Sequence, residues 1–195
     1  GLRRFVELKK EKEGSMLILS SPSGGGKGTA IEHLLKSQKF TLSVSCTTRP
    51  KTKKEIDGVD YYFITTDEFV ERIGKGDFLE YKEVYPGVFY GTLESEAPRA
   101  KREKKILLLD IDVNGAKEVK TLKEEALYVF IDSGDDLGVY KERILKRGRE
   151  KEEEQIKRRL TRIPYELKSG RENADIRIKN SGSIEEYYHE LNIVL

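Results

Sequence analysis

The fold can be read from one segment near the start of the chain, Ser21-Pro22-Ser23-Gly24-Gly25-Gly26-Lys27-Gly28-Thr29. An apolar run at 16–19 precedes it, and apolar residues at helical spacing follow it at 30–35. A strand, a glycine-rich turn and a helix start in this order form a phosphate cradle, because glycines let backbone N–H groups converge on an anion. The helix N-terminus adds partial positive charge, and Lys27 supplies an ammonium for terminal phosphates. The alternative, a glycine-rich turn without a catalytic role, is disfavoured by the preceding strand and by the lysine within the loop.

The loop departs from the strict phosphate-binding pattern GxxxxGK[ST] at both ends. Ser21 stands where the first glycine belongs, and Gly28 stands where a Mg²⁺-binding hydroxyl belongs. The ending Gly-Lys-Gly-Thr at 26–29 instead resembles loops of the adenylate kinase type. We therefore expect Thr29 or water molecules to make the metal contact that Gly28 cannot make.

The bulk composition limits the classes of protein to consider. The length of 195 residues fits one domain with inserted segments, and 36% hydrophobic with 37% charged residues indicate a soluble chain. The formal net charge of +2 is too small to suggest a nucleic-acid partner. No apolar run has the length of a membrane span and no signal-peptide pattern is present, so no membrane partner is expected. Cys46 is the only cysteine, which excludes an internal disulfide and predicts a cytoplasmic location.

Strand-like apolar runs recur along the chain, at 16–20, 41–45, 106–110, 127–131 and 176–179. Helical patterns lie between most of them, notably at 136–147. Strands that alternate with helices predict an α/β fold with a parallel sheet covered by helices on both faces. Ligands bind at the carboxyl ends of the strands in such sheets, and the glycine-rich loop lies at one such end.

Two segments break this alternation. The segment from 60 to 92 reads as strand, helix and strand at 61–64, 68–75 and 78–84, which predicts a small β-rich insertion. The segment 147–168 has few apolar residues to bury, and we expect it to be a mobile helical lid rather than a solvated surface helix. Five arginines favour the lid: Arg147, Arg149, Arg158, Arg159 and Arg162. Pro164 is expected to kink or end its helix.

A second group of polar residues follows the predicted strand at 41–45. The segment Ser-Val-Ser-Cys-Thr-Thr-Arg-Pro at 43–50 brings hydroxyls and the Arg49 guanidinium onto a loop beside the first site. The planar fork of Arg49 suits a second phosphate group. Asp110 and Asp112 follow the strand at 106–109, where a carboxylate can hold Mg²⁺ or its waters, although aspartate also favours strand-end turns.

Six motifs occur in one order along the chain: SPSGGGK at 21–27, SVSCTTR at 43–49, EIDGVDYYF at 55–63, FLEY at 78–81, YGT at 90–92 and LLDIDVNGA at 108–116. Together they resemble the guanylate kinase family, and the match runs from about residue 16 to the end of the chain. The resemblance implies a P-loop NTPase-type parallel sheet, a small β-rich GMP-binding subdomain and a mobile helical lid. It also implies an enzyme that uses Mg²⁺ and ATP to phosphorylate GMP or dGMP.

The resemblance assigns the acceptor GMP to one set of residues. It implies that Arg49, Tyr61 and Tyr90 hold the GMP phosphate, and that Ser45, Glu80, Thr92 and Asp112 surround the guanine. The chemistry agrees, because guanine presents N1–H and N2–H₂ side by side and the Glu80 carboxylate can accept from both. Without the surrounding motif, Glu80 would read as an exposed strand carboxylate.

The resemblance assigns the donor ATP to a second set. It implies phosphate binding by Ser23, Gly24, Gly25, Gly26, Lys27, Gly28 and Thr29, with Thr29 and Asp110 as Mg²⁺ ligands, partly through waters. In the lid, Arg147 and Arg159 match the phosphate-clamping arginines, although Arg158 competes for the second role. Arg143 is expected to face the phosphates too. Asn180 resembles an asparagine that contacts adenine, and a turn residue after the strand is an equally good interpretation. Lys27, Arg49, Arg147 and Arg159 are the predicted catalytic residues.

These assignments predict how the chain is divided. Residues 1–15 form a charged N-terminal extension or a cloning remnant, and residues 16–195 form the kinase-like domain. Within that domain the core comprises 16–46, 93–146 and 169–195, the GMP-binding insertion 47–92, and the lid 147–168.

One departure bears on the acceptor site. The family usually carries a second phosphate-binding arginine three residues after the first, where this chain has Thr52. We expect weaker binding of the GMP phosphate or a shifted contact, because lysine lacks the planar fork and the nearest lysines point to the other side of an extended segment.

Two other functions fit the same motifs less well. One is a non-catalytic guanylate-kinase-like domain that binds peptides, which the intact Lys27 loop and the arginine-rich lid disfavour. The other is a related kinase for another phosphorylated acceptor, such as a ribose bisphosphate. Glu80 and Thr92 disfavour it, because a sugar phosphate has no guanine edge to read.

Overall fold

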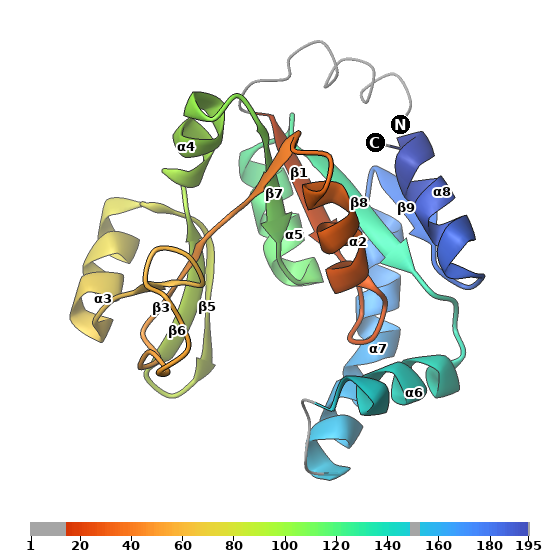
Figure 1. Ribbon diagram of the computed structural model, residues 1–195. Coiled ribbons are helices and arrows are strands. Elements are labelled where there is room, and N and C mark those ends of the chain that lie inside the picture. The colour runs from red at the N-terminus through yellow and green to blue at the C-terminus, as the bar shows by residue number, and fades with distance from the viewer. Residues whose placement is uncertain (1–14, 149–152, 195) are drawn as a thin grey trace.

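The computed structural model describes residues 15–148 and 153–194 and contains two sheets (Figure 1). The larger sheet has five parallel strands in the order β2-β7-β1-β8-β9. These strands are β1 (Met16–Ser20), β2 (Phe40–Leu42), β7 (Ile106–Asp110), β8 (Leu127–Asp132) and β9 (Ile176–Lys179). The predicted extension, except for Ser15, and the lid residue Arg149 lie outside the described residues.

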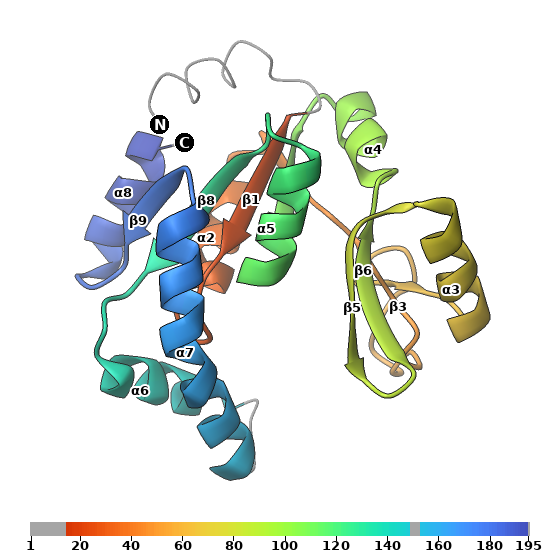
Figure 2. The same ribbon diagram turned by 180° about the vertical axis from the view of Figure 1, so that it is seen from behind.

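Helices cover both faces of this sheet, as parallel strands require. One face carries α2 (Lys27–Leu35) and α8 (Ile184–Val194), which lie before the sheet in Figure 1. The other face carries α5 (Val113–Leu122) and α7 (Glu153–Asn173), which are nearer the viewer in Figure 2. Because successive strand residues point to opposite faces, the neighbours Leu17 and Ile18 belong to different core clusters.

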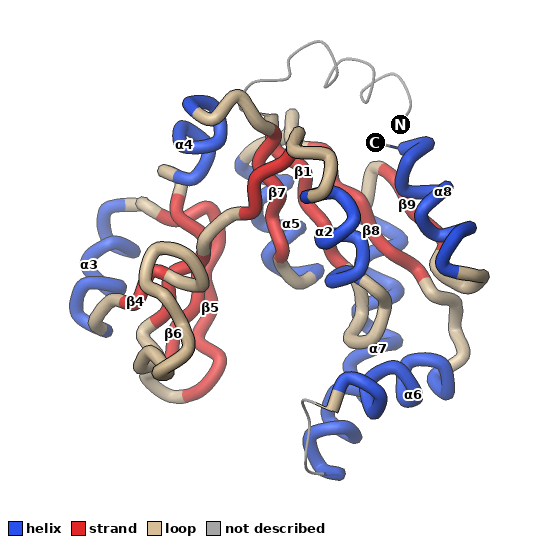
Figure 3. Tube along the Cα trace, viewed as in Figure 1, coloured by secondary structure: helices blue, strands red, loops and turns tan. Residues whose placement is uncertain are grey.

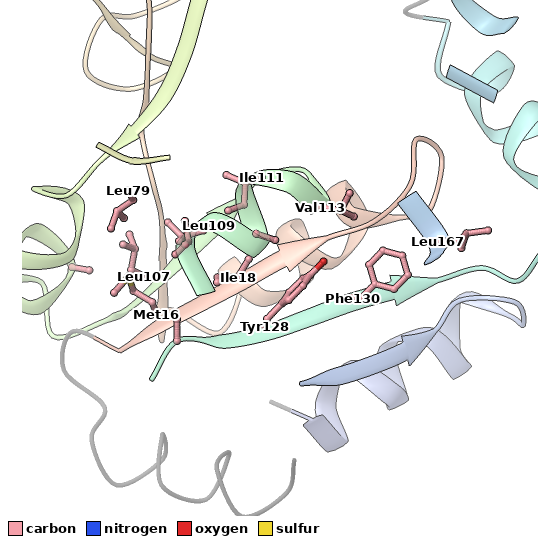
Figure 4. Close-up of a cluster of buried hydrophobic side chains, with 14 of the residues drawn as sticks. Met16, Ile18, Leu79, Leu107, Leu109, Ile111, Val113, Tyr128, Phe130 and Leu167 are labelled. Atoms are coloured by element: carbon pink, nitrogen blue, oxygen red, sulfur yellow. The ribbon is translucent and has the colours of Figure 1, made fainter. Parts of the chain in front are cut away.

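The core beneath α5 and α7 fixes the carboxyl ends of the strands (Figure 4). Ile18, Leu109 and Phe130 are fully buried there, and Val113 and Leu167 cover them from the two helices. Burying one such side chain is worth about 1.5–3 kcal/mol. The loops that follow these strands therefore start from rigid positions.

The predicted insertion folds as a second sheet, with strands in the order β4-β3-β6-β5. These strands are β3 (Ser45–Thr47), β4 (Tyr62–Phe63), β5 (Phe78–Tyr85) and β6 (Val88–Leu93), with α3 (Thr66–Lys75) beside them (Figure 3). Phe69 of α3 is buried between Phe78 and Phe89, with ring centroids 4.4 and 5.2 Å away. The aromatic cluster gives the small sheet a core of its own.

The structure differs from the sequence-based expectation at two strands. The run at 41–45 was expected to be one strand, but it divides into β2 and β3, which belong to different sheets. Ser43 N–H still donates to the Leu108 carbonyl at 2.9 Å, whereas Val44 N–H donates to the Glu96 carboxylate at 2.7 Å. The change of partner at Val44 is where the chain leaves the larger sheet. The second difference is β6, which was not anticipated as a strand.

A buried carboxylate joins the two sheets. Glu96 begins α4 (Glu96–Arg102) and is only 1% exposed. Besides Val44 N–H, its oxygens accept from Tyr62 OH at 3.1 Å and from the Arg99 guanidinium at 2.7 Å. Arg99 also donates to the Leu42 carbonyl at 2.7 Å. This network fixes the chain on both sides of the crossing, so the insertion is anchored to the core at one defined place.

Pro164 does not end the lid helix. α7 runs from Glu153 to Asn173, although proline removes one helical hydrogen bond. Ile163 and Leu167 pack into the core beneath the helix, and this burial holds the helical path through the proline. The helix that precedes it, α6 (Leu137–Arg147), ends at Gly148, whose φ of +62° is a left-handed cap.

Replacing Gly170 with alanine is expected to destabilise the fold by about 1–3 kcal/mol through overpacking. Gly170 lies on α7 where a Cβ atom would overlap the buried Phe130 ring. Gly74→Ala is the matched control, because a Cβ at that α3 position meets no atom within 4 Å. Replacing this helical glycine with alanine should stabilise the fold by about 0.4–1 kcal/mol, because alanine reduces the conformational entropy of the unfolded chain. Urea unfolding measures both, and equal stabilities of the two variants would contradict the packing argument.

Candidate active site

The glycine-rich loop joins β1 to α2 and needs glycine for its shape. Gly24 and Gly26 have φ of +80° and +99°, which side-chain-bearing residues rarely adopt. A Cβ on Gly25 would approach the Pro22 carbonyl oxygen to 2.9 Å. The same carbonyl accepts the Gly25 N–H at 2.9 Å, so the loop turns back on itself.

Buried polar groups hold the loop from behind. The Gly25 carbonyl accepts from Ser133 Oγ at 3.1 Å and from Asn180 Nδ2 at 2.9 Å. The Gly26 carbonyl accepts from Tyr187 OH at 3.1 Å. In a planar trans peptide the next N–H points opposite to the carbonyl. The N–H groups of Gly26 and Lys27 are therefore turned away from this buried side.

Arg143 and Asn180 lie beside the loop, as the sequence predicted, but both are engaged with the protein. The Arg143 guanidinium donates to Ser133 Oγ at 2.7 Å and to the Asn180 carbonyl at 3.0 Å. Asn180 is nearly buried and supports the loop. Both also line a hollow that includes Gly24, Gly26, Thr29 and Arg147. Their contacts with ATP stay predictions.

Lys27 lies at the carboxyl ends of the central strands. Its ammonium contacts Asp110 Oδ1 at 2.7 Å and donates to the Ile111 carbonyl at 3.0 Å. Arg147 approaches from α6, since its Nη2 would lie 3.8 Å from a Cβ on Gly28. The Lys27 ammonium and the Arg147 guanidinium are therefore both close to the loop.

The donor set around Lys27 fits Mg²⁺ held mainly by nucleotide phosphates. Across residues 15–148 and 153–194, no group of three or more His, Cys, Asp or Glu side chains could cage a metal. Mg²⁺ keeps several waters and commonly takes one or two carboxylates plus substrate phosphates. The Asp110 side chain is 43% exposed beside the loop, so water can reach it. Thr29 lines the hollow that Gly24, Gly26 and Arg147 also line.

The small sheet brings the predicted guanine residues into register. Ser45 pairs with Thr92 across β3 and β6, and Thr92 pairs with Glu80 across β6 and β5. Thr92 Oγ1 donates to Glu80 Oε1 at 2.8 Å. Burial raises the pKa of the Glu80 carboxyl, partly opposed by this hydrogen bond. Glu80 is thus largely removed from water, and a ligand that donates hydrogen bonds to its carboxylate would favour the charged form.

Asp112 faces Glu80 from the start of α5. Its Oδ1 accepts the Gly115 N–H at 3.0 Å, which caps the helix, and its Oδ2 contacts Lys82 Nζ at 2.5 Å. Burial alone would raise the pKa of Asp112, but the Gly115 hydrogen bond and the Lys82 ammonium lower it. Lys82 was not among the predicted site residues.

Arg49, Tyr61 and Tyr90 lie together at the other end of this face. Arg49 Nε donates to Tyr90 OH at 3.2 Å, and its guanidinium carbon lies 5.5 Å from the Tyr61 ring centroid. Glu55 takes both remaining guanidinium nitrogens, at 3.0 and 2.6 Å, which lowers the pKa of the Glu55 carboxyl to about 2. Thr52 is exposed, and its N–H donates to Glu55 at 2.8 Å. Arg49 is therefore pre-positioned, but already paired with one carboxylate.

A cleft separates the small sheet from the lid helix. Glu80, Lys82 and Asp112 line one side, and Arg158, Arg159 and Arg162 line the other. Arg159 Nη1 donates to Ser23 Oγ of the loop at 2.9 Å. Arg159 thus contacts the loop, whereas Arg158 faces the same cleft. Which of the two clamps phosphate stays a prediction.

Glu166 is a buried carboxylate of this cleft that sequence reasoning missed. It is only 8% exposed, and burial raises its pKa. Its Oε2 has no hydrogen-bond partner among the residues that the structure describes. The sequence offered no signal for it, because Glu166 lies among many charged residues of a helix.

The glycine-rich loop, the sheet face that carries the Glu80 carboxylate, and the arginine-rich helix that lines the same cleft are the features of a P-loop kinase of the nucleoside monophosphate class. The fold predicted from the sequence is confirmed at this level. The chain belongs to the guanylate kinase family, since residues 13–195 match the family model for guanylate kinase.

Individual relatives agree with the family model. The chain is 44% identical over 158 residues to the guanylate kinase of Thermotoga maritima. The aligned region covers 80% of this chain and 74% of that protein. It is 43% identical over 143 residues to the guanylate kinase of Clostridium acetobutylicum, covering 72% of this chain and 66% of that protein. The crystal structure of guanylate kinase from Anaplasma phagocytophilum matches with a TM-score of 0.62 at 28% identity, covering 94% and 85% of the two chains. The resemblance inferred from the motifs is confirmed.

No helix within the described ranges is long and apolar enough to cross a membrane.

Proposed function

We propose that this chain transfers the γ-phosphoryl group of ATP to GMP or dGMP, giving ADP and the corresponding diphosphate. The observation that carries the proposal is the Glu80 carboxylate, which accepts a hydrogen bond from the buried Thr92 hydroxyl and lines the cleft that also contains Ser23 of the glycine-rich loop. The Glu80 carboxylate complements the N1–H and N2–H₂ of guanine, and the Thr92 hydroxyl would turn its hydrogen from Glu80 to O6. Adenine would leave these buried groups unpaired, which is costly and gives strong discrimination.

On the acceptor side, Arg49, Tyr61 and Tyr90 would hold the GMP phosphate, and Ser45 and Asp112 would complete the surroundings of the base. On the donor side, Lys27 and the N–H groups of 23–29 would bind the ATP phosphates, with Arg143 and Asn180 beside them. We expect Lys27 to exchange part of its contact with Asp110 for phosphate oxygens. The reaction needs alignment and charge neutralisation rather than a covalent intermediate.

Mg²⁺ would be held by Asp110 and Thr29, partly through waters, and would supply charge neutralisation on the phosphate oxygens. Arg147 and Arg159 would neutralise the transferring group from the lid side. Closure of the lid over the cleft would exclude water and so suppress hydrolysis of ATP.

The domain boundaries belong to the same proposal. We propose a core of 16–46, 93–146 and 169–195, an acceptor insertion of 47–92 and a lid of 147–168, with 1–15 outside the domain. The small sheet spans 45–93, which supports the insertion. The packing of Ile163 and Leu167 into the core argues that the part of the lid that moves ends before 163. A cytoplasmic location fits the same proposal.

A panel of acceptors tests the function. The purified chain, ATP and Mg²⁺ are mixed with GMP, dGMP, AMP or ribose 1,5-bisphosphate, and ADP formation is measured. We expect turnover with GMP and dGMP and far less with the other two. Preferred use of the sugar phosphate would support the rival kinase, and binding of GMP without ADP formation would support a non-catalytic domain.

A further inference from the structure

Lys82 lies on the cleft face of the small sheet. Along β5, residues two apart share a face, so Lys82 is on the same side as Glu80. Tyr81, between them, points the other way, toward Phe69 and Phe78, with centroids 6.4 and 5.8 Å away. Lys82 is therefore directed into the cleft that Glu80 and Asp112 line.

The strand register places Lys82 beside the predicted phosphate site. Lys82 pairs with Tyr90 across β5 and β6, just as Glu80 pairs with Thr92. Side chains that face each other in this way have Cβ atoms about 4.5–5.5 Å apart. Tyr90 OH in turn accepts from Arg49. A lysine in this position has a stem long enough to bring its ammonium to an anion at Tyr90.

The side chains predicted to hold the acceptor's phosphate do not neutralise its negative charge. A phosphate monoester carries about −1.5 to −2 charges near neutral pH. Arg49 is bound by Glu55 through two hydrogen bonds, so the pair has no net charge. Thr52 adds a hydroxyl and no charge. The Lys82 side chain is half-exposed, and its ammonium lies 2.5 Å from Asp112 Oδ2.

We infer that Lys82 is a phosphate-binding residue of the acceptor site, which pairs with Asp112 in the empty site and moves to the acceptor's phosphate when the nucleotide binds. This inference rests on the proposed function, because it takes the acceptor to be a guanine nucleotide. Guanine donors that approach Asp112 would compete with the Lys82 ammonium for the same oxygen. Binding of the base would thereby release the cation for the phosphate.

Calorimetric titration with GMP and with guanosine, which lacks the phosphate, separates this role from a structural one. Lys82→Met is expected to weaken GMP binding about tenfold or more, since a hydrogen bond between charged groups is lost. Guanosine binding should not weaken, because the variant removes the competitor for the Asp112 oxygen, whereas loss of a lysine that only positions Asp112 would weaken the binding of both ligands equally. Steady-state kinetics should show a raised KM for GMP and a smaller change in kcat.

Two variants complete the experiment. Lys82→Arg keeps the positive charge and is expected to retain most of the GMP affinity. Lys75→Met removes an exposed lysine that pairs with Glu71 on α3 of the same insertion, and should leave both affinities unchanged. Equal losses for GMP and guanosine in Lys82→Met, or a Lys82→Arg variant as weak as Lys82→Met, would overturn the role of Lys82. Wild-type protein that binds no GMP would instead overturn the proposed function.

Discussion

Replacing Lys27 with methionine is expected to lower kcat for phosphoryl transfer by about 10²- to 10³-fold, the usual effect of removing one preorganised charge-stabilising donor. Lys27 contacts Asp110 and the Ile111 carbonyl at the carboxyl ends of β1 and β7. From this position its ammonium can stabilise the negative charge that develops on the transferring phosphoryl group. Initial rates with saturating ATP and GMP measure the effect.

The control for Lys27 lies on the same helix. Lys36→Met changes an exposed lysine at the other end of α2 and should leave kcat within about twofold. Thermal unfolding of both variants checks the fold, because Lys27→Met also leaves Asp110 without its partner. A Lys27→Met enzyme with wild-type kcat would show that the loop is not the donor site.

Replacing Glu80 with glutamine is expected to lower kcat/KM for GMP by about 10²-fold or more, with little loss for AMP. Glutamine keeps the size of the side chain but exchanges one acceptor oxygen for an NH₂ group. That group would face the guanine donors and leave at least one of them unpaired. Competition of GMP against AMP measures the change in selectivity directly, and an equal loss with both acceptors would contradict the guanine-reading role.

The same substitution is expected to stabilise the fold at neutral pH. Burial raises the pKa of Glu80 in the folded state, so ionisation of this carboxyl costs free energy of folding. The cost is absent below the unfolded pKa and grows as pH rises through the folded pKa. Glu80→Gln should therefore raise Tm at pH 7 and have no such effect near pH 4. Glu71→Gln, at an exposed carboxylate, should show no gain at pH 7.

The larger sheet and the phosphate loop could be predicted because their signals are local. Strand, loop and helix are adjacent in the sequence at 16–35, and four of the five predicted core strands occur nearly as expected. The run at 41–45 was misread because its apolar pattern continues where the hydrogen-bond partners change. That change depends on Glu96, which lies about 50 residues further along the chain.

The site could be predicted only in part, for the same reason. Motifs identified the residues that the proposed function assigns to the acceptor nucleotide, including Arg49, Glu80 and Thr92. They did not show that Arg49 is paired with Glu55, that Lys82 faces Asp112, or that Glu166 is buried without a partner for Oε2 among the described residues. The contact of Lys82 with Asp112 and the burial of Glu166 arise where separate elements meet. The sequence pattern within one element carries no signal for such features.

Transfer of labelled phosphate tests the proposed reaction most directly. The chain is incubated with ATP labelled at the γ-phosphoryl group, GMP and Mg²⁺, and the products are separated. We predict that the label appears in GDP with one ADP formed for each GDP, that little inorganic phosphate is released without GMP, and that chelation of Mg²⁺ stops the reaction. Label found only in inorganic phosphate, or no turnover at all with GMP bound, would contradict the assignment of this chain as an ATP-dependent guanylate kinase.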